Sequence, residues 1–351
     1  MNLSGTRPFA DADPFQHQHT FQPPHAHLPH LQHASDIGLL RSTILPSFTL
    51  HTTLDIATFI AAKATNRAEL KDWCWPTSQV LNAWWSAIGH QVYQHNISPQ
   101  TAWSGLTYTD KLLLSLVTAW GTRLFARVAS RSITRGKDDP RYEQLKQQDP
   151  KGFWWNALWK QYLPEAVFLT LVSLPFTVPF KLTASSLDLD SDVQATVRAL
   201  GVALFGTGFA LEVLADEQLK LHKEDGRMDL CRTGVWSIVR HPNYLGDTLI
   251  HTSFLLLNAA SNFNPIVLLG PLTNYLFLRF VGGDRQTEAS QEARYVVDDP
   301  ARYAQLQSWR ASKNSFWPGV KEIVNPWVWG VVGVGVAGVV VEEGVRGLFS
   351  T

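Results

Sequence analysis

This sequence has few cysteines and no net charge. The 351 residues include two cysteines, Cys74 and Cys231, which lie far apart and predict neither a disulfide framework nor a zinc site. Lysine plus arginine and aspartate plus glutamate number 30 each, so the net charge is zero and no basic surface for nucleic acid is expected. The first residues lack the basic region and apolar core that are typical of a secretory signal.

Apolar and aromatic residues are plentiful instead, with 14 tryptophans and 18 phenylalanines, while charged residues make up only 17% of the chain. The mean hydropathy of -0.07 averages polar stretches with long apolar ones. Membrane insertion depends on the hydropathy of each segment, not on the mean of the whole chain. Apolar segments lie at about 37–62, 76–93, 108–128, 153–180, 193–215, 244–260 and 265–282. We therefore predict an all-α polytopic membrane bundle with six or seven transmembrane helices.

Three parts of the chain differ in composition. Residues 1–36 are rich in His, Pro and Gln, and their irregular histidine spacing favours a solvated disordered tail over a metal-binding one. Residues 37–320 hold the apolar segments and are predicted to form one membrane domain. Residues 321–351 form a segment rich in Gly and Val, and whether its apolar run at 327–341 spans the membrane stays open.

That last run contains the pattern G-x-G-x-x-G at Gly333, Gly335 and Gly338. A dinucleotide-binding turn with this pattern needs a strand before it, a helix after it and an acidic residue about 20 positions further on. The run offers no such context, so we do not predict a Rossmann site there.

Three polar stretches, at about 129–152, 218–241 and 283–325, would lie on one side of the membrane if the segments between 153 and 282 all span it. The first two are rich in Lys and Arg, which predicts that this side is cytosolic. A site for a cytosolic nucleotide is expected to be built from one side only.

Arginines spaced by four lead from the apolar segment 108–128 into the first stretch and share one helix face: Arg123, Arg127, Arg131 and Arg135. Such a stripe can bind phosphate groups or anchor a helix end to anionic lipid. In the second stretch, Glu212, Asp216 and Lys220 share a helix face with Lys223. They form either a solvated, salt-bridged turn or the polar groups that hold a nucleotide.

The segment R-H-P-N-Y-L-G-D at 240–247 joins a loop to a helix, because Pro242 disfavours helix at His241 and can begin one itself. The predicted helix then carries a polar stripe at Asn243, Asp247 and His251. Polar residues on one face of a membrane helix face a cavity or partner groups rather than lipid. Tyr244 is placed to donate a proton or to stack on a cofactor.

Several motifs together resemble one family. They are A-D-x-Q at 215–218 followed by Lys223, G-x-W-x-x-x-R-H-P-N-Y-x-G-D at 234–247, and R-x-x-x-R-G-K-x-D-x-R-Y at 131–142. They resemble the C-terminal half of the steroid 5α-reductase family and the related sterol C14/C7 reductases. Members are polytopic membrane enzymes, and the resemblance implies that NADPH reduces a carbon–carbon double bond in a sterol, enone or other lipid. It covers about residues 110–320.

The resemblance also implies roles for particular residues. A cytosol-facing NADPH pocket would be lined by Arg123, Asp216, Gln218, Lys223, Arg240, His241, Asn243, Tyr244, Glu288 and Tyr303. Tyr244 would donate the proton, supported by Asp247 or His251. The family's habit further predicts the endoplasmic reticulum as the location, and no metal is implied.

Two other interpretations stay open. The core R-H-P-x-Y-x-G also occurs in isoprenylcysteine-type methyltransferases, which use S-adenosylmethionine, although the polar residues Asn243 and Asp247 favour the reductases. A non-catalytic membrane scaffold with a vestigial pocket is the second, because residues 37–110 show no counterpart of the substrate-binding residues of steroid 5α-reductases.

Overall fold

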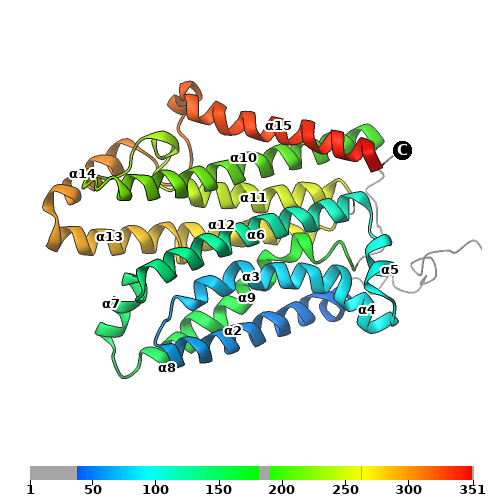
Figure 1. Cartoon of the computed structure of the whole chain (residues 1–351), viewed down its shortest axis with the longest axis horizontal. Coiled ribbons are helices and arrows are strands. Elements are labelled where there is room, and N and C mark those ends of the chain that lie inside the picture. Colours follow the sequence, from blue (N-terminus) through cyan, green and yellow to red (C-terminus); the bar gives the residue numbers. More distant parts are fainter. Residues whose placement is uncertain (1–37, 182–189, 262, 350–351) are drawn as a thin grey trace, which may run out of the picture.

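The computed structural model describes residues 38–181, 190–261 and 263–349, and every regular element within them is helical (Figure 1). The α-helices are α2 (Leu45–Thr65), α3 (Leu70–Trp84), α4 (His90–His95), α5 (Pro99–Ser104), α6 (Tyr108–Arg135), α7 (Pro140–Gln148), α8 (Phe153–Ala157), α9 (Leu163–Val172), α10 (Ser191–Glu224), α11 (Pro242–Ala259), α12 (Leu269–Leu276), α13 (Asp284–Asp298), α14 (Pro300–Ser312) and α15 (Pro326–Phe349). The predicted all-α bundle is confirmed over these residues. The predicted tail at 1–36 lies outside them.

Five helical stretches of the described residues are long and apolar enough to cross a membrane, which supports an integral membrane protein. They are Leu40–Thr65, Tyr108–Arg135, Ser191–Glu224, Pro265–Asp298 and Pro326–Leu348. The last contains the run at 327–341 that the sequence left open. The predicted segments at 76–93, 153–180 and 244–260 are also largely helical but do not meet both criteria. They are shorter or interrupted, and the third carries the polar stripe of α11.

Helix α10 packs along α11 at a glycine contact. A Cβ built on Gly246 of α11 would lie 2.6 Å from the carbonyl oxygen of Gly208 on α10 and 2.9 Å from the amide nitrogen of Glu212. Small residues at such crossings let membrane helices approach closely, where packing rather than the hydrophobic effect drives association. The two glycines thus set the distance between the two helices that carry most of the predicted site.

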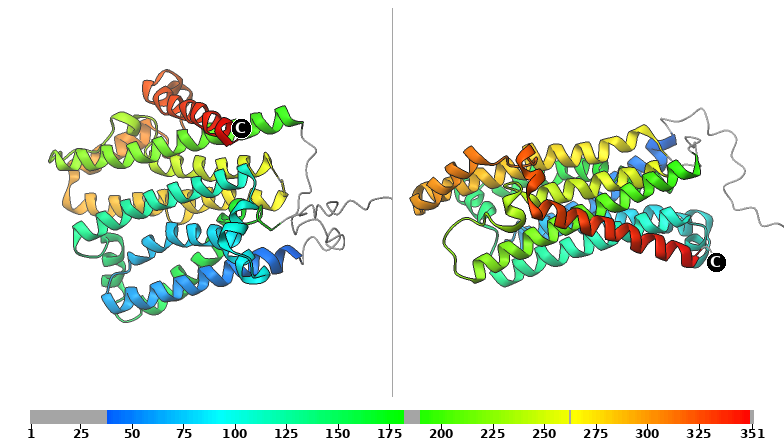
Figure 2. Two further views of the ribbon diagram at one scale, coloured as in Figure 1. Left: turned by 45° about the vertical axis from the view of Figure 1, so that its right-hand side comes forward. Right: turned by 90° about the horizontal axis from the view of Figure 1, so that it is seen from above.

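Helix α15 packs on the other side of α10 through a second glycine contact, and Figure 2 shows it lying across that helix. A Cβ on Gly206 would lie 2.9 Å from the Cα of Gly335. Gly333, Gly335 and Gly338 all lie within the helix, and Gly335 alone of the three makes the close contact with α10. The decision against a Rossmann turn is confirmed.

The apolar core between α6, α10 and α11 is aromatic. Trp120, Phe176 and Phe254 are fully buried, and the rings of Phe176 and Phe254 meet edge to face with their centroids 5.5 Å apart. This core fixes the middle of the bundle and holds Trp120 against the polar face of α11.

The three polar stretches meet at one end of the bundle. The C-terminal ends of α6 and α10, the start of α11, and helices α13 and α14 all lie there, at the left of Figure 1. The three stretches thus lie together as expected, and whether they form a nucleotide site stays a prediction.

Candidate functional site

The loop before α11 is held by the segment that follows α14. The amide of Arg240 donates to the carbonyl of Asn314 at 3.1 Å, and the amide of His241 donates to the carbonyl of Ser315 at 2.9 Å. His241 is extended, with φ -130° and ψ 68°, and Pro242 is the first helical residue. The helix start predicted from Pro242 is confirmed, and two distant polar stretches join at the loop.

Asp247 is the carboxylate of the polar stripe on α11, and side chains of two other helices bind it. It is 7% exposed, and each of its oxygens accepts one hydrogen bond: from the indole N–H of Trp120 on α6 at 3.0 Å and from the amide of Asn274 on α12 at 3.0 Å. Because three helices supply the bonded groups, Asp247 fixes how α6, α11 and α12 sit relative to one another.

The rest of the stripe is buried but not satisfied. Within the described residues no hydrogen bond reaches either ring nitrogen of His251, the side-chain oxygen of Asn243 or the hydroxyl of Thr248. His251 is 0% exposed and its ring lies edge-on to Trp120, with the centroids 4.9 Å apart. Buried polar groups almost always have a partner, so these atoms mark a place that water or a polar ligand can complete.

Arg123 bridges α6 and α10. Its guanidinium donates to the carboxylate of Glu212 at 2.7 Å and to that of Asp216 at 2.6 Å. Glu212 is 3% exposed, and its second carboxylate oxygen accepts no hydrogen bond. The predicted cofactor residues Arg123 and Asp216 therefore lie together and form an ion pair.

Gln218 supports the loop after α10. Its side-chain oxygen accepts from the amide of Val235 at 2.9 Å and lies over Gly234, whose φ is 66°. A Cβ on Gly234 would lie 2.2 Å from that oxygen. The indole of Trp236 donates to the carbonyl of Ala215 at 3.0 Å. Gln218, Gly234 and Trp236 thus position the loop that leads to Arg240.

Glu288 of α13 contacts several basic side chains of the site. It accepts from the guanidinium of Arg240 at 2.8 Å, from that of Arg310 on α14 at 3.0 Å, and contacts His241 Nε2 at 3.0 Å. Burial disfavours the charged form of Arg310, but Glu292 and Glu288 outweigh it and raise the pKa of this guanidinium above its usual value. The predicted residues Arg240, His241 and Glu288 come together, and their main contacts are with one another.

Donor atoms of His241, Asp284 and Glu288 lie within 4.8 Å of one another, close enough to surround a metal ion. Arg279 already pairs with Asp284, and Arg240 and Arg310 pair with Glu288. These guanidiniums supply the positive charge that a metal would bring, so the arrangement favours an ion-pair cluster, and the absence of a metal stays a prediction.

Tyr244 follows Asn243 in the first turn of α11 and lies about one turn before Asp247. Its hydroxyl lies 2.9 Å from the hydroxyl of Thr287, and its ring stacks on His241 with the centroids 5.3 Å apart. Arg131 and Arg141 are close enough to act on the phenol electrostatically. The phenol is therefore influenced by a cationic surface and by the carboxylate of Asp72, which acts with the opposite sign.

That surface is a basic rim, defined here as Arg127, Arg131, Lys223 and Arg294. Lys223 is exposed at the end of α10, and the arginines of the rim, together with Arg135, act on its charge. Among the described residues, no ion pair with a carboxylate is found for Arg131, Lys223 or Arg294. Arg127 differs from these three, since it lies 3.6 Å from a carboxylate oxygen of Asp216. A group of cations with few paired carboxylates attracts anions.

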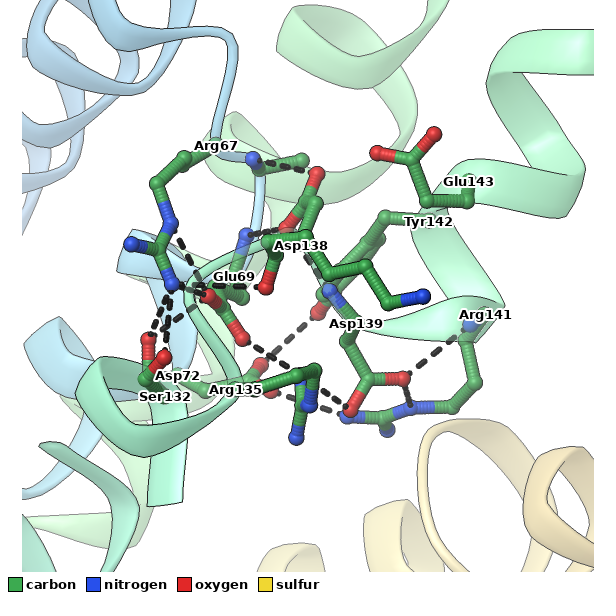
Figure 3. Close-up of polar contacts among 12 residues, drawn as sticks. Arg67, Glu69, Asp72, Ser132, Arg135, Asp138, Asp139, Arg141, Tyr142 and Glu143 are labelled. Carbon is green, nitrogen blue, oxygen red and sulfur yellow. Dashed lines mark hydrogen bonds and ion pairs between the residues drawn. The ribbon is translucent and has the colours of Figure 1, made fainter. Parts of the chain in front are cut away.

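Arg135 is not part of the basic rim. Figure 3 shows it in an ion network that ties the start of α7 to the turn between α2 and α3. It pairs with Glu69 at 2.7 Å and Asp139 at 3.2 Å, while Arg141 pairs with Asp72 at 2.9 Å. Burial disfavours ionised Asp139, but Arg141 and Arg135 outweigh it and hold the pKa of this carboxyl below its usual value. The motif at 131–142 is therefore largely structural.

Tyr303 of α14 is half-buried, and the structure gives no side-chain contact that places it against the stripe, so its role stays a prediction. Sequence reasoning missed Asn274, Thr287, Arg294 and Arg310. Asn274 had a usable signal, because it is a polar residue within the apolar segment 265–282. The others lie in a polar stretch where every position looks alike.

Comparisons with known proteins place the chain in a family. A family model described as "Protein of unknown function (DUF1295)" matches residues 58–308, which is well over half of the chain and includes every predicted site residue. No curated protein matches significantly, and no solved structure does. The chain belongs to the DUF1295 family.

Proposed function

We propose that this protein is an NADPH-dependent reductase that reduces a carbon–carbon double bond in a lipophilic substrate within the membrane. The observation that carries the proposal is the position of the basic rim relative to the stripe. Arg131 acts electrostatically both on Lys223 in the rim and on Tyr244 in the first turn of α11, the helix on which Asn243, Thr248 and His251 carry unsatisfied atoms.

The charge of the rim favours a phosphate-bearing cofactor. NADPH carries several phosphate groups, and guanidiniums bind phosphate oxygens in pairs. S-adenosylmethionine has a single carboxylate and a cationic sulfonium, so a rim of like-charged groups suits it less. The resemblance to sterol reductases agrees with this ranking, and the methyltransferase stays the second candidate.

NADPH would supply a hydride, and the residues of this chain would hold the substrate and provide the proton. In the proposal, Tyr244 donates its phenolic proton to the carbon next to the one that accepts the hydride, and Thr287 holds the hydroxyl in place. Asn243 offers an unsatisfied carbonyl oxygen to an amide such as the one on nicotinamide.

Asp247 and His251, which follow Tyr244 on α11, would support it. Asp247 keeps the stripe in register through Trp120 and Asn274, and we assign it a positioning role. His251 is buried with both ring nitrogens free of hydrogen bonds, so it can bind a polar group of the substrate or a water that leads protons towards Tyr244.

The test is ligand-dependent stabilisation of the detergent-purified protein by NADPH, NADH and S-adenosylmethionine. A ligand that binds only the folded state stabilises it by about 2.7 kcal/mol at a hundredfold excess over its dissociation constant. We expect stabilisation by NADPH, less by NADH, and none by S-adenosylmethionine. Stabilisation by S-adenosylmethionine alone would establish the methyltransferase, and no response to any of the three would favour the scaffold.

A further inference from the structure

A second buried polar cluster lies in the N-terminal half, between α2, α3 and α9. It consists of His51 and Asp55 on α2, Lys71 and Cys74 on α3, and Glu165 on α9. Asp55 is 1% exposed, Glu165 is 2% exposed and His51 is 0% exposed. Ionisable residues inside a membrane bundle are costly and are usually functional.

The two carboxyl groups differ in their contacts. Glu165 forms an ion pair with the ammonium group of Lys71 through Oε2, while its buried Oε1 has no hydrogen bond. Asp55 forms no ion pair within the described residues, so its charge has no such compensation. Asp55 receives only a weak hydrogen bond, from the Cys74 thiol to Oδ1 at 3.6 Å, and its Oδ2 makes no hydrogen bond although it is buried. A buried carboxylate oxygen without a partner carries a large desolvation cost, which a proton on that oxygen removes.

The balance of charges in the cluster also indicates a proton on Asp55. Asp55 and Glu165 act on each other electrostatically, and Lys71 is the cation that faces both. Two ionised acids and one ammonium would leave one unpaired negative charge in the bundle.

The neighbouring groups cannot balance that charge. The guanidinium of Arg141 is already paired with Asp72 at 2.9 Å and with Asp139 at 2.9 Å. The hydroxyl of Tyr162 donates to the carbonyl of Ala68 at 3.2 Å. His51 faces Asn82, whose amide nitrogen lies 3.1 Å from its Nε2, and its Nδ1 has no hydrogen bond.

We propose that the cluster of Asp55, Glu165 and Lys71 is a proton-binding site, and that it holds one exchangeable proton on Asp55 at neutral pH. Glu165 stays ionised against Lys71, and the trio is neutral. The Lys71 side chain is 14% exposed at the start of α3, next to the ion network of Asp72 and Arg141, so the proton exchanges with the polar end of the bundle.

Infrared spectroscopy of the full-length protein tests this directly, because a protonated carboxyl has a C=O stretch that is separate from that of a carboxylate and shifts in D2O. At neutral pH we expect Asp55→Asn to lose one such acid band relative to the wild type. Lys71→Gln is expected to gain a band of similar area, since Glu165 then also takes a proton. Asp72→Asn is the matched control and should leave the acid bands unchanged.

An acid region that is the same in Asp55→Asn and the wild type would overturn the proposal. If Asp55→Asn fails to fold, the wild-type protein labelled with ¹³C at aspartate carboxyls carries the test. The proposal requires an acid band that shifts with this label, and an unshifted acid region contradicts it. Neither result depends on whether NADPH binds.

Discussion

Gly246→Ala tests whether the α10–α11 contact sets the geometry of the site. The new methyl group would lie 2.6 Å from the Gly208 carbonyl oxygen and 2.9 Å from the Glu212 amide nitrogen, and both are backbone atoms that cannot turn aside. Overpacking of this kind costs about 1–3 kcal/mol, while replacing glycine by alanine in a helix gains about 1 kcal/mol. We expect a net loss of about 1 kcal/mol and a larger loss for Gly246→Val.

Gly333→Ala on α15 is the matched control, because a Cβ there meets no atom within 4 Å. It should be neutral or stabilising, since only the helix-propensity gain of about 1 kcal/mol remains. Thermal unfolding of the three variants in one detergent provides the ranking. If Gly246→Ala were as stable as Gly333→Ala, the close packing of α10 on α11 would be refuted.

Three further predictions follow from single contacts. Trp120→Phe removes the indole N–H that Asp247 accepts, and should lower the free energy of unfolding by about 1.5–3 kcal/mol, measured by thermal unfolding. Glu288→Gln leaves Arg240 and Arg310 without their shared carboxylate and should cost about 3 kcal/mol in the same assay; a neutral effect would refute the cluster. The pKa of Asp139 is lowered, so its stabilisation is present above about pH 3.9 and is lost as the pH falls through the folded-state value. Asp139→Asn should therefore flatten the acid end of the stability profile, and an unchanged profile would contradict the network.

The fold was largely predictable because the signals are local. Apolar segments mark the helices, and Pro242 marks the start of α11. Thr107 and Asp110 form the capping box that begins α6, with each side chain bonded to the other's backbone amide. The number of spanning helices was less predictable, because α11 mixes an apolar surface with Asp247 and His251, and hydropathy alone does not separate a buried polar stripe from a break.

The site was only partly predictable. The sequence placed Tyr244 and Asp247 on one helix, which the structure confirms, but it could not show that Trp120 and Asn274 hold Asp247, because those partners lie 127 and 27 residues away. The arginine stripe was treated as one unit. It divides in the structure, because a helix face turns past several neighbours: Arg123 meets Glu212, Arg131 stays in the basic rim and Arg135 meets Glu69.

Gly246 gives a similar lesson, since its place in the motif at 234–247 does not show that it lets α10 approach α11. Close contacts between helices depend on which faces meet, and a single sequence does not specify that. The same holds for Asp55 and Glu165, which lie 110 positions apart in the chain and meet only because α2 packs on α9.

The most direct measurement of the central proposal is the NADPH dissociation constant of Lys223→Ala beside that of Lys321→Ala. Both lysines are exposed at the polar end of the bundle, but only Lys223 lies in the basic rim. The proposal predicts that Lys223→Ala weakens NADPH binding about tenfold, corresponding to about 1.4 kcal/mol, and that the loss shrinks as salt is added. Lys321→Ala should bind like the wild type. Equal affinities for the two variants would contradict the assignment of the rim to a phosphate-bearing cofactor.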